Sequence, residues 1–351
     1  MLTPQSNTTL EAIARFIEEH ETFAICGHVN PDGDCLGSQL ALEQGLRVLG
    51  KRVTGLLATD QPIEAKLGFL PGSENLVPAK DFDEDVEVFI AVDVPNVDRL
   101  KDAAAVHDRA QYRITIDHHA SDTSMADLNY VDPASPSACD LIWELLKLLG
   151  CVDEAQALCA LTGIMTDTGR FSYQNTTPVC LIHAAETVEA GAEPNLIARE
   201  FFQSRSLPSL RLEQLTLDRM MFFCDGAFVF SYLKESDFDA TGAIRDDAEI
   251  LIDVLRNIAG VHIALILKEN GEGTIRGSLR AKDDTDVAAI ARVFGGGGHK
   301  AAAGLTFHGT LYEACVAVPT EVLTSCFAAA APEEVARLNE LLASQKAEID
   351  G

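Results

Sequence analysis

The sequence lacks long apolar runs and an excess of basic residues. No stretch reaches the roughly 18 consecutive apolar residues of a membrane-spanning helix, and residues 1–9 lack the basic start of a signal peptide. The chain has 27 Lys and Arg against 54 Asp and Glu, a net charge of −27, which argues against a broad basic groove for long DNA or RNA. We therefore expect a cytoplasmic protein that binds neither a membrane nor long-duplex nucleic acid.

The sequence also lacks closely spaced cysteines. Its nine cysteines are scattered, without a C-x-x-C pair, and most lie in apolar segments. Such cysteines are typical of reduced, buried thiols in a cytosolic protein. A zinc site built from sulfur ligands is therefore not expected.

The length and the order of the sequence patterns predict two α/β domains. The 351 residues, 47% of them apolar, suffice for two hydrophobic cores. Residues 1–192 alternate strand-like runs with helical patterns, which predicts a parallel sheet built from βαβ units. We expect a helical linker over 193–218, a smaller mixed α/β domain over 219–331 and a helical tail over 332–351.

Four groups of Asp and His side chains follow apolar runs in the first domain. In chain order they are His28-x-x-x-Asp32-x-Asp34, Asp93, Asp117-His118-His119 and Asp167. We expect each group at the end of a strand, and the carboxyl ends of parallel strands share one edge of a sheet. Side chains that are far apart in the sequence would therefore converge there.

So many carboxylates in one crevice would repel each other without cations. Two divalent metal ions would relieve this repulsion, lower the pKa of a bound water and hold phosphoryl oxygens. Oxygen and imidazole ligands favour Mn²⁺ over Zn²⁺, with Mg²⁺ or Co²⁺ as alternatives. A single Asp at a strand end is more often a helix N-cap or a turn residue, so the inference depends on all four groups together.

These motifs resemble, in order and context, the DHH phosphoesterase superfamily. Near the other end, Gly295–Gly298 followed by His299 looks like the Gly-Gly-Gly-His signature of the DHH-associated C-terminal domain. The match covers roughly residues 10 to 330, and the whole chain is similar to the bacterial nanoRNase and pAp phosphatase group. The resemblance implies a parallel-sheet catalytic domain, a smaller mixed α/β domain and an active site in the cleft between them.

The resemblance also implies roles for individual residues. It gives two overlapping sets of metal ligands, which are His28, Asp32 and Asp93 for the first ion and Asp34, Asp93, His118 and Asp167 for the second. His119 would face the phosphate as a donor or general acid, with a structural role beside the ligands as the alternative. Asp117 would hold the histidines through hydrogen bonds, or be an ordinary turn carboxylate.

Contacts to the substrate are expected from both domains. The glycine run allows positive φ angles and close approach of the backbone, so successive N–H groups can cup an anion. Arg280 would grip a phosphate through two N–H groups, and Arg99 would either contact a phosphate or form an ion pair near the site. The predicted substrate-binding residues are Asn30, Arg99, Arg280, Gly296, Gly297, Gly298 and His299.

The implied activity is a two-metal phosphodiesterase that hydrolyses short oligoribonucleotides (nanoRNA) to mononucleotides. 3′-Phosphoadenosine 5′-phosphate (pAp) would be a second substrate, converted to AMP. One alternative is a phosphodiesterase for linear dinucleotides derived from cyclic dinucleotides. Another is a nucleotide-binding regulator with an inactive site, against which the intact ligand set speaks. A homodimer is left open.

Overall fold

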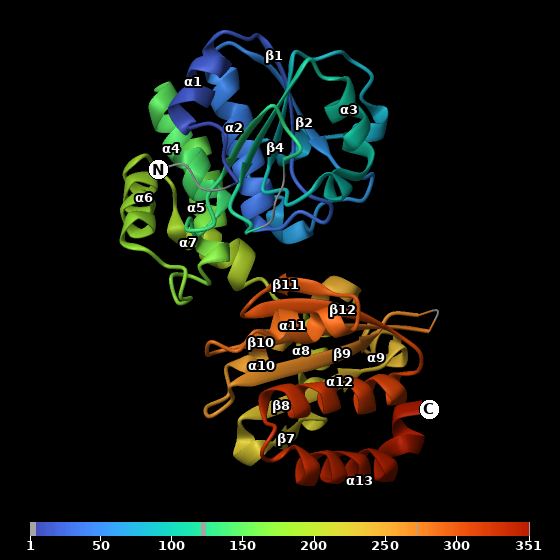
Figure 1. Ribbon diagram of the computed structural model, residues 1–351. Helices are drawn as coiled ribbons and strands as arrows, with labels where there is room; N and C mark the ends of the chain where they lie inside the picture. Colours follow the sequence, from blue (N-terminus) through green and yellow to red (C-terminus); the bar gives the residue numbers. More distant parts are fainter. Residues whose placement is uncertain (1–4, 121–123, 272, 351) are drawn as a thin grey trace. The chain divides into compact units, whose positions relative to one another are not determined.

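The computed structural model describes residues 5–120, 124–271 and 273–350. The chain forms two compact units, Met1–Ser204 (unit 1) and Arg205–Gly351 (unit 2), each built around one six-stranded sheet (Figure 1). Unit 1 has a parallel sheet and unit 2 a mixed one, which confirms the predicted α/β class. Within the described ranges, no helix has both the length and the apolar character that a membrane span requires.

The parallel sheet of unit 1 reverses its strand order between β1 and β4. Its strands are β1 (Thr22–Cys26), β2 (Arg52–Leu57), β3 (Val77–Pro78), β4 (Val88–Val92), β5 (Tyr112–Asp117) and β6 (Leu128–Val131). They lie in the order β3-β2-β1-β4-β5-β6, so the chain moves outward first on one side of β1 and then on the other. In open α/β sheets, ligands bind at the carboxyl ends of the strands at such a reversal.

Helices cover both faces of this sheet. They are α1 (Leu10–Glu18), α2 (Gly33–Val48), α3 (Ala104–Arg109), α4 (Ala138–Leu149), α5 (Glu154–Asp167), α6 (Pro178–Glu189) and α7 (Pro194–Ile197). The short helical turns are η1 (Ala65–Leu67), η2 (Ser73–Asn75), η3 (Ala79–Asp81), η4 (Val97–Ala103) and the π-helical turn η5 (Ala198–Phe202). Side chains of α1, α2, α4 and α5 form the core on one face, and α3, η3 and η4 cover the other.

Two glycines let α2, α4 and α5 approach one another closely. A Cβ at Gly37 would lie 2.6 Å from the carbonyl oxygen of Cys159, and a Cβ at Gly163 would lie 2.2 Å from the sulfur of Cys139. Both distances are shorter than a van der Waals contact, so only glycine fits at these positions. The close packing brings the start of α2 and the end of α5 to the same edge of the sheet.

Unit 2 has a mixed sheet with helices on both faces. Its strands, in the order β11-β12-β10-β9-β8-β7, are β7 (Met221–Phe223), β8 (Phe228–Leu233), β9 (Ile263–Glu269), β10 (Thr274–Ala281), β11 (Gly297–His299) and β12 (Ala302–His308). One face packs against α8 (Leu207–Asp218), α9 (Glu235–Thr241), η7 (Arg245–Ala248) and α10 (Leu251–Arg256). The other face packs against α11 (Val287–Val293), α12 (Leu311–Cys326) and α13 (Ala331–Asp350), while η6 (Cys224–Gly226) links β7 to β8.

Half of the glycine run belongs to a strand. Gly297–His299 form β11, which pairs antiparallel with β12. A Cβ at Gly296 would lie 2.1 Å from the carbonyl oxygen of Gly304, and a Cβ at Gly298 would lie 2.5 Å from that of Ala302. Glycine is therefore required here because two backbones approach closely, as the sequence predicted, whereas the cupping of an anion stays a prediction.

Candidate active site

Three of the four Asp and His groups lie at the carboxyl ends of β1, β4 and β5, as predicted. His28 comes two residues after β1, Asp93 directly follows β4, and Asp117 ends β5. The expectation of a strand end was wrong for the fourth group, since Asp167 is the last residue of helix α5. A capping box formed by Asp153 and Gln156 begins this helix, so the apolar segment before Asp167 is helical.

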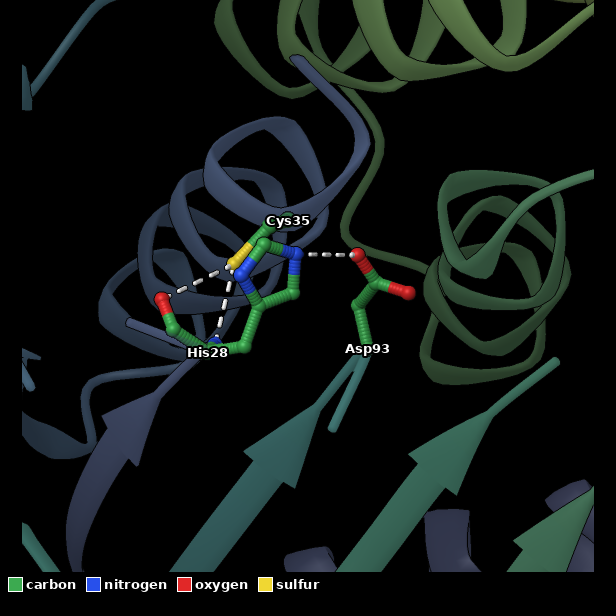
Figure 2. A group of neighbouring side chains, drawn as sticks. All are labelled: His28, Cys35 and Asp93. Atoms are coloured by element: carbon green, nitrogen blue, oxygen red, sulfur yellow. Dashed lines mark hydrogen bonds and ion pairs between the residues drawn. The ribbon is translucent and has the colours of Figure 1, made fainter. Parts of the chain in front are cut away.

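Asp93 is at the centre of the group. Its Oδ2 lies 3.4 Å from Nε2 of His28, and its Oδ1 lies 3.4 Å from Nε2 of His118. Figure 2 shows the carboxylate of Asp93 directed at a ring nitrogen of His28. Asp93 is buried and has a φ of 58°, a left-handed conformation that costs a non-glycine residue about 1 to 3 kcal/mol. The strained backbone thus presents each carboxylate oxygen to a different histidine.

Nε2 of His118 is surrounded by three carboxylates. It lies 3.6 Å from Oδ2 of Asp34, 3.4 Å from Oδ1 of Asp93 and 3.5 Å from Oδ2 of Asp167. These distances exceed those of hydrogen bonds, and Oδ1 of Asp93 is buried without a hydrogen bond. Neighbouring ligands of a divalent cation bonded at about 2.2 Å lie about 3 to 3.6 Å apart. Asp34, His118 and Asp167 are therefore close enough to share a divalent cation, and Asp93 adjoins them through His118.

The backbone fixes the ring of His28. Its Nδ1 lies 2.9 Å from the carbonyl oxygen of Val29, which can only accept a hydrogen bond, so Nδ1 carries the proton. Nε2 is then the ring nitrogen left for the site, and it faces Asp93 and, at 4.0 Å, Oδ2 of Asp32. A hydrogen bond of this kind on the second ring nitrogen is the usual support of a metal-binding histidine. Nη2 of Arg99 lies 3.4 Å from the same Nδ1.

Asp32 and Asp34 are both held by helix N-termini. Oδ1 of Asp32 accepts hydrogen bonds from the backbone N–H groups of Asp34 and Cys35, which makes Asp32 the N-cap of α2 and leaves Oδ2 for the site. The carboxylate of Asp34 accepts from the N–H groups of Ala138 at 2.7 Å and Cys139 at 2.8 Å, at the start of α4. Backbone N–H groups at helix N-termini, where the helix dipole favours negative charge, therefore fix the position of both carboxylates.

Asp117 contacts both histidines that follow it. Its fully buried Oδ1 accepts from the backbone N–H of His118 at 2.9 Å and lies 2.8 Å from Nδ1 of His119. Because a carboxylate only accepts, Nδ1 of His119 donates this bond. His119 also lies beside Asp93, with Nδ1 at 3.5 Å from Oδ1.

The carboxylates disturb one another's titration. Burial, and then the charge of Asp93, raises the pKa of Asp34 to about 7, and burial likewise raises the pKa of Asp167. Burial would also raise the pKa of Asp93, but the imidazoles of His118 and His28 outweigh it and hold this pKa well below its usual range. A divalent cation would stabilise the ionised form of these mutually repelling carboxylates. Oxygen and imidazole donors suit Mn²⁺.

Cys35 also lies against this group. The backbone N–H of His28 donates to its sulfur at 3.1 Å, and the sulfur, His28 and Asp93 are close enough to share an ion (Figure 2). However, burial raises the pKa of the Cys35 thiol to about 11, so the sulfur is protonated at neutral pH. Cys35 thus packs behind His28 and places a thiol beside the oxygen and imidazole donors.

The remaining predicted residues are divided between the two units. Asn30 is exposed in unit 1, with a φ of 56°. In unit 2, Arg280 and Gly295–Gly298 line a cavity of about 460 Å³, and His299 is exposed at the end of β11. The interdomain cleft stays a prediction.

Sequence reasoning missed five polar residues of this cavity, which are Glu249, Lys268, Arg276, Ser278 and Thr306. Arg276, Ser278 and Arg280 alternate along β10 and therefore share one face, and Lys268 is the direct partner of Arg276 on β9. The alternation of polar and apolar residues along β10 is the sequence signal that could have identified Arg276 and Ser278.

Models of two protein families match the chain. The N-terminal domain of the DHH family matches residues 22–164, and the DHHA1 domain matches residues 225–324. The bifunctional oligoribonuclease and PAP phosphatase NrnA of Thermus thermophilus is 32% identical over 286 residues, which are 81% of this chain and 84% of that protein. The Bacillus subtilis protein of the same name is 26% identical and covers 84% of this chain and 92% of its own length.

The cyclic-di-AMP phosphodiesterase GdpP of Geobacillus thermodenitrificans is more distant. It is 23% identical over 82% of this chain, which is only 45% of GdpP.

Solved structures share the fold. An exopolyphosphatase-related protein from Bacteroides fragilis superposes with a TM-score of 0.83 at 25% identity, covering 94% of this chain and 97% of that one. RecJ of Thermus thermophilus, in complex with Mn²⁺, superposes with a TM-score of 0.51 at 15% identity, covering 96% of this chain and 56% of RecJ.

Proposed function

Because the chain belongs to the DHH family, we propose that it is a metal-dependent phosphoesterase that hydrolyses short oligoribonucleotides to mononucleotides and pAp to AMP. The NrnA relatives are named for these two activities, and the similarity extends over most of each chain. The structural observation that most supports the proposal is Asp93, whose two oxygens face two different histidines. A carboxylate placed in this way can bridge two cations, the arrangement that clamps both sides of an in-line displacement at phosphorus.

We assign the metal ligands in two sets that share Asp93. The first set is His28, Asp32 and Asp93, and the second is Asp34, Asp93, His118 and Asp167. Two cations bound there would lower the pKa of a water and polarise phosphoryl oxygens. The chain's own groups do the positioning. The N-terminus of α4 holds Asp34, the carbonyl of Val29 orients His28, and Asp117 holds His119, whose Nε2 would donate to the phosphate.

The proposal is tested by comparing substrates. Purified protein with Mn²⁺ should hydrolyse a mixed-sequence RNA dinucleotide such as 5′-phosphorylated UpC, and also pAp, because the proposed chemistry depends on the phosphate and not on adenine. Product release should be followed by chromatography for both substrates, for linear diadenylate, for cyclic diadenylate and for pyrophosphate. Pyrophosphate serves as the control and should not be hydrolysed.

One observation favours a second candidate function. The similarity to GdpP, which is named for cyclic diadenylate, extends over 82% of this chain. A phosphodiesterase for products of cyclic dinucleotides would hydrolyse the diadenylates and leave UpC intact, and this result would replace the first proposal with the second.

Chelation followed by metal addition should show a preference for Mn²⁺. Enzyme stripped with a chelator should lose turnover and regain it best with Mn²⁺, because carboxylate and imidazole ligands together suit this ion. Mn²⁺ should also raise the melting temperature, since an ion at 100 times its dissociation constant stabilises the folded state by about 2.7 kcal/mol. Both effects are measured in parallel for each ion. Equal recovery with Ca²⁺ alone would contradict the assigned ligand chemistry.

A further inference from the structure

Four side chains of unit 1 form cation–aromatic pairs that the metal site does not use. Cζ of Arg170 lies 4.9 Å from the centre of the Phe202 ring, and Nζ of Lys66 lies 4.7 Å from that of Phe201. The two rings touch each other, with centres 4.9 Å apart and planes at 67°. We call these four residues the cation–aromatic cluster.

The cluster is tied to the predicted metal ligand Asp167 by a short, constrained turn. Arg170 comes three residues after Asp167, so their Cα atoms are at most about 11 Å apart. Gly169, Arg170 and Phe171 have φ angles of 55°, 61° and 63°, three consecutive left-handed residues of which two are not glycine. The N–H of Arg170 donates to the carbonyl of Met165 at 2.7 Å, which holds the turn. The turn therefore fixes the backbone of Arg170 within about 11 Å of Asp167.

The two rings come from the π-helical turn η5. A π turn accommodates an extra residue relative to an α-helix, and such turns are frequent at functional sites. Phe201 and Phe202 pack against the core of unit 1 and yet remain half-buried, so part of each ring is accessible. The aromatic pair is thus a fixed platform and not a mobile side-chain group.

Arg170 has a planar face and a charge to offer to a ligand. It is exposed, and no carboxylate in the part of the chain that the structure describes pairs with it, although acidic residues outnumber basic ones two to one. Lys66, by contrast, pairs with Glu64 at 2.6 Å. Nucleobases stack on aromatic rings and on the planes of arginine guanidinium groups, whose N–H edges remain available to phosphate. A plane combined with an uncompensated charge fits a nucleotide better than an isolated phosphate.

We propose that the cation–aromatic cluster stacks one nucleobase of the oligonucleotide next to the scissile phosphate, with Arg170 as the main contact. The inference rests on the proposed function and adds a specificity determinant to it. A dinucleotide carries two bases and pAp only one, so the cluster favours RNA over pAp.

The test compares Michaelis constants of the full-length, Mn²⁺-loaded protein. Arg170→Ala should raise KM for an RNA dinucleotide about tenfold, the lower part of the range expected for one stacked base, with little change in kcat. KM for pAp should change less than about twofold. Arg170→Lys retains the charge without the plane and should resemble Arg170→Ala. Phe202→Leu should show the same split between the two substrates.

Arg109→Ala is the matched control. Arg109 also covers a phenylalanine ring of unit 1, with Cζ 5.7 Å from the centre of Phe82, but it belongs to α3 and is far from Asp167 in the sequence. We expect both KM values to be unchanged in this variant. Melting temperatures recorded for every variant separate lost contacts from lost folding.

A second measurement makes the inference independent of turnover. A dinucleotide that contains 2-aminopurine should lose fluorescence on binding in Ca²⁺, because stacking quenches this base, and Arg170→Ala should lose the quenching. An unchanged dinucleotide KM in Arg170→Ala, an equal rise for pAp, full rescue by lysine, or unchanged quenching would each overturn the inference. Failure of the wild-type protein to cleave any dinucleotide would instead overturn the proposed function.

Discussion

Replacing Asp93 by alanine should reduce kcat by at least about a hundredfold on every substrate. The substitution removes the one carboxylate that faces both His28 and His118, and therefore a ligand of both proposed cations at once. A hundredfold loss corresponds to about 2.7 kcal/mol of transition-state stabilisation. His28→Ala should affect one set of ligands only. The checks are steady-state rates and metal content, with two ions per chain in the wild type, one in His28→Ala and fewer than two in Asp93→Ala.

His107→Ala is the control for these variants. His107 is as buried as His28, with exposed fractions of 6% and 7%, and its Nε2 also lies within hydrogen-bond distance of a backbone carbonyl, that of Met125. It lies outside the proposed ligand sets, so its loss should lower the stability of the fold and leave the metal content at two. The bridging role of Asp93 is wrong if Asp93→Ala keeps more than about a hundredth of the wild-type rate, or keeps both ions.

The second large effect concerns the length of the RNA and the cavity of unit 2. This cavity of about 460 Å³ is lined by Lys268, Arg276 and Arg280 together with the glycine run, and by one carboxylate, Glu249, which pairs with Lys268 at 2.6 Å. In a chain with a net charge of −27, every phosphate outside such a locally cationic region meets repulsion within the screening length of about 8 to 10 Å. RNAs of two to about five nucleotides should therefore be cleaved much faster than 20-mers, as measured by kcat/KM for 2-, 5- and 20-nucleotide substrates.

Variants of the same cavity locate the effect. Arg280→Ala and His299→Ala should lose at least about 90% of kcat/KM on a dinucleotide, because one charged contact to a phosphate contributes about 1.5 to 3 kcal/mol. Both variants should keep two metal ions. Their kcat/KM on bis(p-nitrophenyl) phosphate, a phosphodiester without nucleosides, should fall far less. Arg292→Ala is the control, since Arg292 is an exposed arginine on the neighbouring helix α11 that pairs with Asp286. Equal rates at all three lengths, or equal losses on both substrates, would contradict this account.

The sequence predicted the candidate site best where an Asp or His side chain follows an apolar strand. His28, Asp93 and Asp117 each come directly after an apolar run, and a parallel sheet brings the ends of such runs together. Asp167 has the same local pattern, but its run is helical, and a short apolar run does not distinguish a buried strand from a buried helix. Asp167 reaches the other ligands because α5 packs closely against α2 and α4, and no local sequence pattern predicts these helix contacts.

Contacts between distant segments were the part that could not be predicted. Arg170 and Phe202 are 32 positions apart, and their pairing depends on a left-handed turn and a π-helical turn that the residue types do not favour. Likewise, β11 was not predicted as a strand, because glycine disfavours strands in general and only the pairing with β12 defines it. The position of Cys35 against the backbone of His28 also follows from the tertiary fold alone.

The close packing at Gly163 has a consequence for how this chain can vary. A Cβ at this position would lie 2.7 Å from Oδ1 of Asp34 as well as against the sulfur of Cys139. Gly163 has no side chain that could act as a ligand, yet a single added methyl group would push α5 away from α4 and carry Asp167 with it. The site can therefore be lost through a neutral-looking exchange of glycine for alanine that leaves every ligand in the sequence. A survey of natural variants that checks only the ligands would count such a chain as active.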